Sequence, residues 1–180
     1  MAAEKSALRE YLEAFVIAVV LALFIITFIA QSFIVQGRSM EPTLFDGERL
    51  LVDKLTYRFR PPRAGEIIVF RYPADPSRKF IKRIIGVPGD EVMIRDTIVY
   101  VNGKPLKEDY ISAPTYGDWG PRKVPRNSYF VLGDNRNNSD DSRFPDVGFV
   151  GRDLIMGRAV ARYWPLPAVG ILGVPETFSR

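Results

Sequence analysis

The chain has 180 residues, enough for one domain and a further segment, and its net charge is +4. It contains no cysteine and no histidine. That composition excludes disulfides, thiol nucleophiles, the Ser-His-Asp triad and most zinc sites. Catalysis would have to use Ser, Thr, Lys, Asp, Glu, Tyr or a bound cofactor. The modest charge, without a long Lys/Arg block, gives no reason to expect nucleic acid as a partner.

An apolar stretch, AFVIAVVLALFIITFIA, occupies residues 14–30. As a helix it would be about 25 Å long, and its flanks bring it close to the roughly 30 Å apolar core of a bilayer. A cleaved signal peptide fits less well, because a cut after Ala30 would place Phe28 at position −3. We therefore predict a short tail (1–12), whose cytoplasmic location is implied only by the resemblance given below, and a retained transmembrane anchor (13–31). The basic residues on its two sides do not decide its orientation.

The remaining residues, 32–180, carry mainly strand signals, and no long amphipathic helix pattern follows residue 45. We predict a mostly β fold, in which a single N-terminal transmembrane helix precedes a domain of coiled antiparallel sheet. A small inserted lobe or long loop is expected at about 96–127. The expected strands are β-branched and aromatic runs that end at turn residues: Glu66–Tyr72, Asp96–Val101 before the turn dipeptide Asn102-Gly103, Ser128–Leu132 and Leu154–Trp164.

Ser39 and Lys82 are the clearest candidates for catalytic residues. Ser39 follows the apolar stretch by only nine residues, so a nucleophile there would meet substrates at a membrane surface. A helix N-cap is the simpler interpretation of a lone serine before Glu41. Lys82 lies in an apolar segment, and in a strand it shares one face with its apolar neighbours while Arg83 shares the other. If either face is buried, one cation enters an apolar layer.

A buried lysine could replace the missing histidine as a base. A free lysine has a pKa of about 10.4 and is almost wholly protonated at neutral pH. Burial can lower the pKa of a lysine by as much as about 3–5 units, which is enough to make the neutral amine available. Lys82 could then activate Ser39 if the two side chains lie within hydrogen-bond distance. These residues favour a Ser-Lys hydrolase that works at a membrane.

Four segments, in this order, closely resemble the type I signal peptidases, the membrane-bound Ser-Lys serine proteases. They are SMEPTL (39–44), LLVDKLTYRF (50–59), KFIKRIIGVPGD (79–90) and GDNRNNSDDSR (133–143). The resemblance implies an endopeptidase that removes signal peptides from exported preproteins, cutting after small residues (Ala-X-Ala type) through an acyl-enzyme. It implies no cofactor. It also implies a single-pass protein of the cell membrane, with its catalytic domain (32–180) on the extracytoplasmic face and the lipid bilayer and preproteins as partners.

The same resemblance implies roles for individual residues. Ser39 would be the nucleophile and Lys82 the general base, with Ser139 orienting the lysine amine and Gly133 packing closely against that lysine. Some members have a serine at the position of Gly37 that assists the oxyanion hole, so the second oxyanion donor is left open here. An ion pair would support the site, formed by Asp141 and Arg143. Small apolar substrate pockets would involve Phe33, Val35, Met40, Leu44, Phe80 and Ile81.

Other interpretations were weighed. Residues 134–145 are rich in Asp and Asn, but an EF-hand frame from Asp134 fails at Arg136, Ser139 and Pro145. We therefore expect no metal there. Tight turns would explain the segment by itself, but together with the other three segments it is better explained as support around Lys82. A self-cleaving repressor would need a DNA-binding helix-turn-helix in place of the anchor. An inactive membrane-tethered β module that binds exported chains is the main alternative. The oligomeric state and the kind of membrane, plasma or photosynthetic, remain open.

Overall fold

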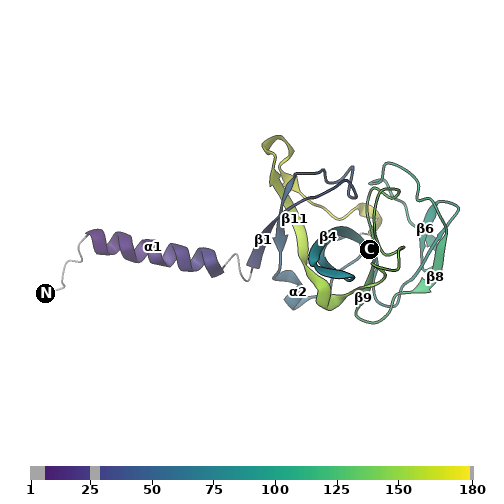
Figure 1. Cartoon of the computed structure of the whole chain (residues 1–180), viewed down its shortest axis with the longest axis horizontal. Coiled ribbons are helices and arrows are strands. Elements are labelled where there is room, and N and C mark those ends of the chain that lie inside the picture. Colours follow the sequence, from purple (N-terminus) through teal and green to yellow (C-terminus); the bar gives the residue numbers. More distant parts are fainter. Residues whose placement is uncertain (1–6, 25–28, 179–180) are drawn as a thin grey trace.

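A computed structural model describes residues 7–24 and 29–178 of the chain. Helix α1 (Ala7–Phe24) extends away from a domain built mainly of strands, which contains the rest of the described chain (Figure 1). Every strand pair in that domain is antiparallel. The expected mostly β, antiparallel fold is confirmed.

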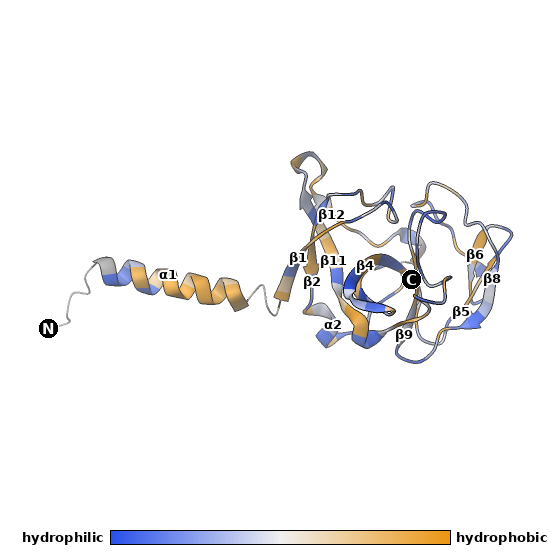
Figure 2. Ribbon diagram, in the orientation of Figure 1, coloured by the Kyte–Doolittle hydropathy of each residue, from blue (hydrophilic) through white to orange (hydrophobic). Residues whose placement is uncertain are grey.

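The apolar side chains of α1 are exposed, and they dominate its second half (Figure 2). Within the described residues, no helix combines the length and apolar character needed to cross a membrane. The anchor predicted at 13–31 includes residues 25–28, which lie outside the described part. Its last two residues, Ala30 and Gln31, belong to strand β1 (Ala30–Ile34), which pairs with β2 (Arg49–Asp53). The pairing of β1 with β2 therefore begins at Ala30, the last residue of the apolar stretch.

The larger sheet of the described residues contains eight strands, in the order β1-β2-β11-β3-β4-β9-β10, with β12 paired to β11. Three of the four predicted strands belong to it, as β3, β9 and β11. Short helical turns connect its strands at α2 (Thr56–Phe59) and at residues 152–154 and 166–168, and another follows the last strand at 176–178. The strand bounds not yet given are β3 (Ile67–Tyr72), β4 (Asp75–Gly86), β9 (Ser128–Leu132), β10 (Val150–Gly151), β11 (Ile155–Trp164) and β12 (Gly170–Ile171).

A second sheet of four strands, in the order β7-β6-β5-β8, forms the inserted lobe. Its strands are β5 (Glu91–Arg95), β6 (Ile98–Val101), β7 (Lys104–Pro105) and β8 (Trp119–Lys123). The lobe therefore begins at Glu91, before the expected residue 96. The predicted turn at Asn102-Gly103 joins β6 to β7, and both of its residues have positive φ angles, 53° and 73°. Asp96 and Thr97, expected in a strand, instead form the turn between β5 and β6, with φ of 50° and 67°.

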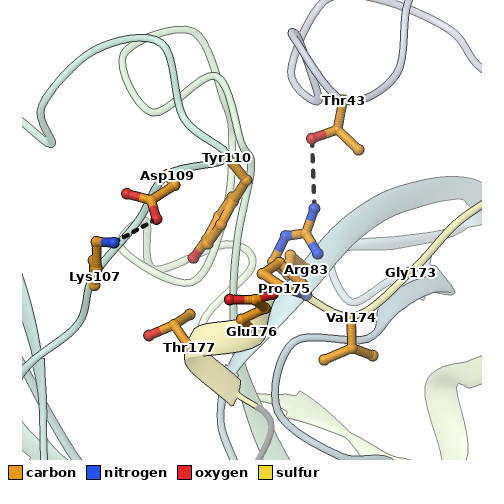
Figure 3. Close-up of a pocket in the computed structure, with 10 residues that line it drawn as sticks. All are labelled: Thr43, Arg83, Lys107, Asp109, Tyr110, Gly173, Val174, Pro175, Glu176 and Thr177. Carbon is orange, nitrogen blue, oxygen red and sulfur yellow. Dashed lines mark hydrogen bonds and ion pairs between the residues drawn. The ribbon is translucent and has the colours of Figure 1, made fainter.

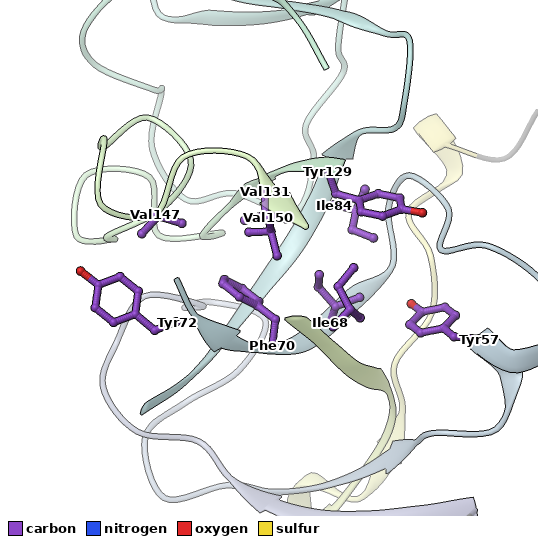
Figure 4. Close-up of a cluster of buried hydrophobic side chains, with 10 residues drawn as sticks. Tyr57, Ile68, Phe70, Tyr72, Ile84, Tyr129, Val131, Val147 and Val150 are labelled. Carbon is purple, nitrogen blue, oxygen red and sulfur yellow. The ribbon is translucent and has the colours of Figure 1, made fainter. Parts of the chain in front are cut away.

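Strand β4 lies where three clusters of buried apolar side chains meet. Its Ile84 belongs to the first cluster, together with Phe70 and other residues drawn in Figure 4. Its Ile81 packs against the second cluster, which surrounds Leu44, and its Ile85 belongs to the third, in the inserted lobe. Because tightly packed interiors resist displacement, β4 is a rigid support for the side chains it carries.

Candidate active site

The structure brings Lys82 and Ser39 together. Lys82 lies on β4, directly opposite Ile68 of β3, and Ser39 lies in the turn between β1 and β2. The Lys82 Nζ donates a hydrogen bond of 2.8 Å to the Ser39 Oγ. Only 4% of the Lys82 surface is exposed. A hydroxyl is therefore held in contact with an amine that is almost removed from water.

The burial of Lys82 lowers its pKa from the usual 10.5 to about 8. Desolvation is the main cause, because an apolar surrounding disfavours the charged ammonium. The carboxylates of Asp141, Asp140 and Asp134 act in the opposite direction and keep the pKa from falling further. At mildly alkaline pH a substantial fraction of the molecules therefore has a neutral amine beside Ser39.

Arg83, the next residue on β4, is also buried, with 1% of its surface exposed. Its guanidinium forms two hydrogen bonds with the carboxylate of Asp134, of 2.9 and 2.6 Å, and a third with the carbonyl of Gly65. The alternation of the strand predicted one buried cation. The structure has two, because apolar clusters cover both faces of β4. Arg83 is paired with the carboxylate of Asp134, whereas desolvation favours the neutral form of Lys82.

The turn that carries Ser39 is held by the segment that begins at Asp134. The backbone N–H of Asn135 donates to the carbonyl of Ser39 at 3.0 Å, and its side-chain amide donates to the carbonyl of Arg38 at 3.0 Å. The hydroxyl of Thr43 donates to Asp134 at 2.6 Å. Sequence reasoning missed the contributions of Thr43, Arg83, Asp134 and Asn135. All four lie inside the segments that carry the family resemblance, which was the available signal.

Asp141 and Arg143 form the ion pair that the resemblance implied. The guanidinium of Arg143 donates two hydrogen bonds to the carboxylate of Asp141, of 2.8 and 2.9 Å. Asp141 also accepts a hydrogen bond of 3.1 Å from the backbone N–H of Gly133, and Arg143 donates to the carbonyl of Arg136. The pair therefore shapes the backbone of the 133–143 segment.

Gly133 lies close to two serine residues. A Cβ atom on Gly133 would collide first with Ser139 and with the carbonyl oxygen of Ser39. The packing of Gly133 against Lys82 stays a prediction. The buried Ser139 Oγ has no hydrogen-bond partner among the described residues, Lys82 included. Gly133 thus allows the close approach of two serine residues. The orientation of the lysine amine by Ser139 stays a prediction.

The six residues expected at the substrate pockets are divided between two clusters. Val35, Met40 and Leu44 are buried in the second cluster, and Phe33 and Ile81 pack against it while remaining partly exposed. Phe80 packs instead against the first cluster and against the ring of Tyr72. Gly37 has a φ of 83°, and its N–H donates to Asp46 at 2.7 Å. That N–H is therefore already engaged, and the second oxyanion donor is still unassigned.

A cavity of about 720 Å³ lies next to Arg83 (Figure 3). Ser39 and Lys82 do not line it. The C-terminal segment forms one wall, and the inserted lobe and the Ser39 turn contribute the remainder. Its lining residues are Thr43, Arg83, Lys107, Asp109, Tyr110, Gly173, Val174, Pro175, Glu176 and Thr177.

Comparisons with known proteins identify the family. Residues 8–164 match the model of the family described as signal peptidase, peptidase S26. A probable signal peptidase I-2 of Synechocystis sp. is 52% identical over 163 residues, which are 87% of this chain and 73% of that protein. A signal peptidase I of Leptolyngbya laminosa is 46% identical over a match that covers 96% of this chain and 88% of that protein. A signal peptidase I of Bacillus licheniformis is 39% identical, covering 90% of this chain and 91% of that protein. The chain, with its paired serine and buried lysine, therefore belongs to the signal peptidase I family of serine peptidases.

Proposed function

We propose that this peptidase removes signal peptides from exported preproteins with Ser39 as nucleophile and Lys82 as general base. The observation that carries the proposal is the 2.8 Å hydrogen bond between the Lys82 Nζ and the Ser39 Oγ, made by an amine that is 4% exposed. A serine hydroxyl is a weak nucleophile at neutral pH and needs an adjacent base. Lys82 is in the right place and, with its pKa lowered to about 8, has the right proton affinity.

The reaction proceeds in two steps. The Ser39 Oγ attacks the scissile carbonyl while its proton passes to the neutral amine of Lys82. The C–N bond then breaks, the proton goes to the departing amine, and an ester to Ser39 remains. Lys82, neutral again, takes a proton from water, and the hydroxide that forms attacks the ester. The bond to the Ser39 Oγ then breaks, and the proton returns from Lys82 to that oxygen, which regenerates the neutral amine and the hydroxyl. The backbone N–H of Ser39 stabilises the oxyanion in both steps.

The substrate binds beside Phe33 of β1 and Ile81 of β4, which pack against the same cluster. Phe33 and Ile81 are only partly buried in the second cluster and face the bound chain, while Val35, Met40 and Leu44 close the pockets from behind. Phe80 lies beside Lys82, with the amine 5.1 Å from its ring centroid, and limits the space next to the scissile bond. These bulky walls favour small side chains at positions −1 and −3. Cleavage after Ala-X-Ala, which the family resemblance implies, is compatible with this arrangement.

The apolar stretch that includes α1 holds the peptidase in the cell membrane as a single-pass protein, with the β domain on the extracytoplasmic side. Most apolar side chains of α1 are exposed in the described structure, for example Phe15 (66%), Val20 (60%) and Leu23 (60%). Apolar side chains exposed all round a helix are suited to lipid rather than to water. A peptidase anchored in this way meets preproteins whose signal peptides lie in the same bilayer.

The lowered pKa of Lys82 gives the reaction a defined pH dependence. Only the neutral amine accepts a proton, so kcat/KM is expected to rise about tenfold per pH unit and to level off above pH 8. The pKa of Lys82 is lower in the folded chain than in the unfolded one. Its burial therefore destabilises the fold most below pH 8, and this cost disappears as pH approaches 10.5. The profile is measured with a peptide that has no titrating group near the scissile bond, and a flat profile from pH 6 to 9 would contradict the assigned base.

The function is tested with the full chain in detergent and a model preprotein that ends its signal peptide in Ala-X-Ala. We expect one cut, directly after the second alanine, identified by sequencing the N-terminus of the product. A preprotein with leucine at position −1 should resist cleavage, and Ser39→Ala, purified in the same way, serves as the control for contaminating proteases. Cutting by Ser39→Ala, or no cutting of several preproteins by the wild type, would reject the proposal and leave a tethered binding module as the better account.

A further inference from the structure

We propose that Thr43 is a positioning residue that fixes the Ser39 turn relative to Lys82 through its hydrogen bond to Asp134. The inference rests on the proposed function. It adds a residue whose effect on the reaction is exerted entirely through the placement of another side chain.

Thr43 connects the turn to the strand that carries Lys82. Its hydroxyl donates to Asp134 Oδ2 at 2.6 Å, and the same oxygen accepts a hydrogen bond of 2.6 Å from Arg83. Arg83 and Lys82 are neighbours on β4. Thr43, Asp134 and Arg83 therefore form a continuous link from the far end of the turn to the backbone next to the proposed base.

The two ends of the turn are held by the same segment. Asn135, which directly follows Asp134, binds the carbonyl of Ser39 through its backbone N–H. The side chain of Met40, between these two attachments, and that of Leu44, just after the second, are buried in the second cluster. The Thr43 hydroxyl fixes the polar side of the turn to Asp134. Removing it leaves the turn attached to this segment mainly at the Ser39 end.

The Thr43 side chain is not held in place by packing alone. A valine would place a methyl group where the hydroxyl lies 2.6 Å from Asp134 Oδ2, and because Thr43 borders the 720 Å³ cavity shown in Figure 3, the side chain can turn away from that oxygen. Thr43→Val therefore removes a hydrogen-bond donor without overfilling the core, and Asp134 keeps both of its bonds to Arg83. Few positions near the site allow so limited a change.

The expected effect is on kcat. A displacement of about 1 Å between reacting groups can reduce a rate by about 10²-fold, and Thr43→Val weakens one of several attachments of the turn. We expect kcat to fall about 10- to 50-fold with KM changed less than threefold. Thr43→Ser, which keeps the hydroxyl, should restore kcat to within about threefold of the wild type. The midpoint of the pH profile should stay in place, because Lys82 remains buried.

The matched control is Thr56→Val, which removes a threonine hydroxyl that donates to Asp53 near the start of α2. It should lower the melting temperature without lowering kcat. If Thr43→Val lowers only the melting temperature, or if Thr43→Ser loses as much activity as Thr43→Val, Thr43 is structural and the proposal is wrong. An upward shift of the pH midpoint with an unchanged plateau would also overturn it, because Thr43 would then act by shielding Lys82.

A crystal structure of the full-length Thr43→Val variant tests the same inference without any activity. We expect the Ser39 Oγ to lie beyond hydrogen-bond distance of the Lys82 Nζ, and an intact 2.8 Å contact would overturn the inference. This measurement separates the two proposals. A wild type that cleaves no preprotein rejects the proposed function, whereas the distance between the two atoms still decides whether Thr43 positions Ser39.

Discussion

Lys82→Met is expected to reduce preprotein cleavage by about 10³-fold or more, because the Ser39 hydroxyl loses the group that accepts its proton. Methionine has a similar length and no charge. Since the ammonium form of Lys82 is costly in a site that is 4% exposed, the variant should fold at least as stably as the wild type. Initial rates with a model preprotein in detergent, together with thermal unfolding of the same samples, measure both expectations.

The control for this variant is Lys104→Met, at an exposed position on β7 in the inserted lobe. It should keep the wild-type rate within about threefold, as surface substitutions usually do. The double variant Ser39→Ala/Lys82→Met should be no slower than either single variant, because the two residues act as a unit. Near-wild-type cleavage by Lys82→Met would show that another group is the base. A loss that matches a loss of folding would leave the role of Lys82 unsupported.

Asp134→Ala is expected to lower the free energy of unfolding by about 3–5 kcal/mol, the usual cost of removing one partner of a buried ion pair. The pair is fully enclosed, since Arg83 is 1% exposed and Asp134 is 0% exposed. The variant leaves the guanidinium of Arg83 buried without a counterion, and it also removes the acceptor of Thr43. Urea unfolding followed by tryptophan fluorescence measures the change.

A surface pair and a double variant serve as controls for this second prediction. Lys107 and Asp109 form an ion pair with side chains that are 80% and 76% exposed, so Asp109→Ala should change stability little. Arg83→Leu/Asp134→Leu should be more stable than Asp134→Ala, because it removes the unpaired charge together with its partner. If Asp134→Ala proves as mild as Asp109→Ala, the buried pair contributes nothing measurable to the fold.

Much of the fold could be predicted because its strands are locally encoded. The runs at Glu66–Tyr72, Ser128–Leu132 and Leu154–Trp164 became β3, β9 and β11 with bounds that changed by at most one residue. The point at which the apolar stretch changes from helix to strand was less predictable. Ala30 is as compatible with a helix as with a strand, and its pairing with Asp53 depends on residues more than twenty positions away.

Reasoning from the residues predicted Ser39 and Lys82, the family resemblance added supporting and substrate-pocket residues, and the structure adds the contacts among them. Alternation along β4 could indicate that a cation would be buried, but only the packing of three clusters shows that Lys82 and Arg83 are both enclosed. The network of Thr43 and Asp134 joins segments 91 residues apart. Such a contact leaves no periodic pattern in a single sequence, so no reasoning from local residue types could have found it.

The opposite orientations of Lys82 and Arg83 on β4 make strand alignment a condition for catalysis. In the native pairing, Lys82 lies opposite Ile68 of β3. A slip of one residue would turn every side chain of the strand to the other face and place Arg83 beside Ser39. A guanidinium does not give up its proton in proteins, so it cannot serve as the base. Because apolar clusters cover both faces of β4, a chain misfolded in this way could keep its strands and still bury apolar side chains, yet be inert. The yield of active peptidase therefore reports how accurately β3 and β4 pair.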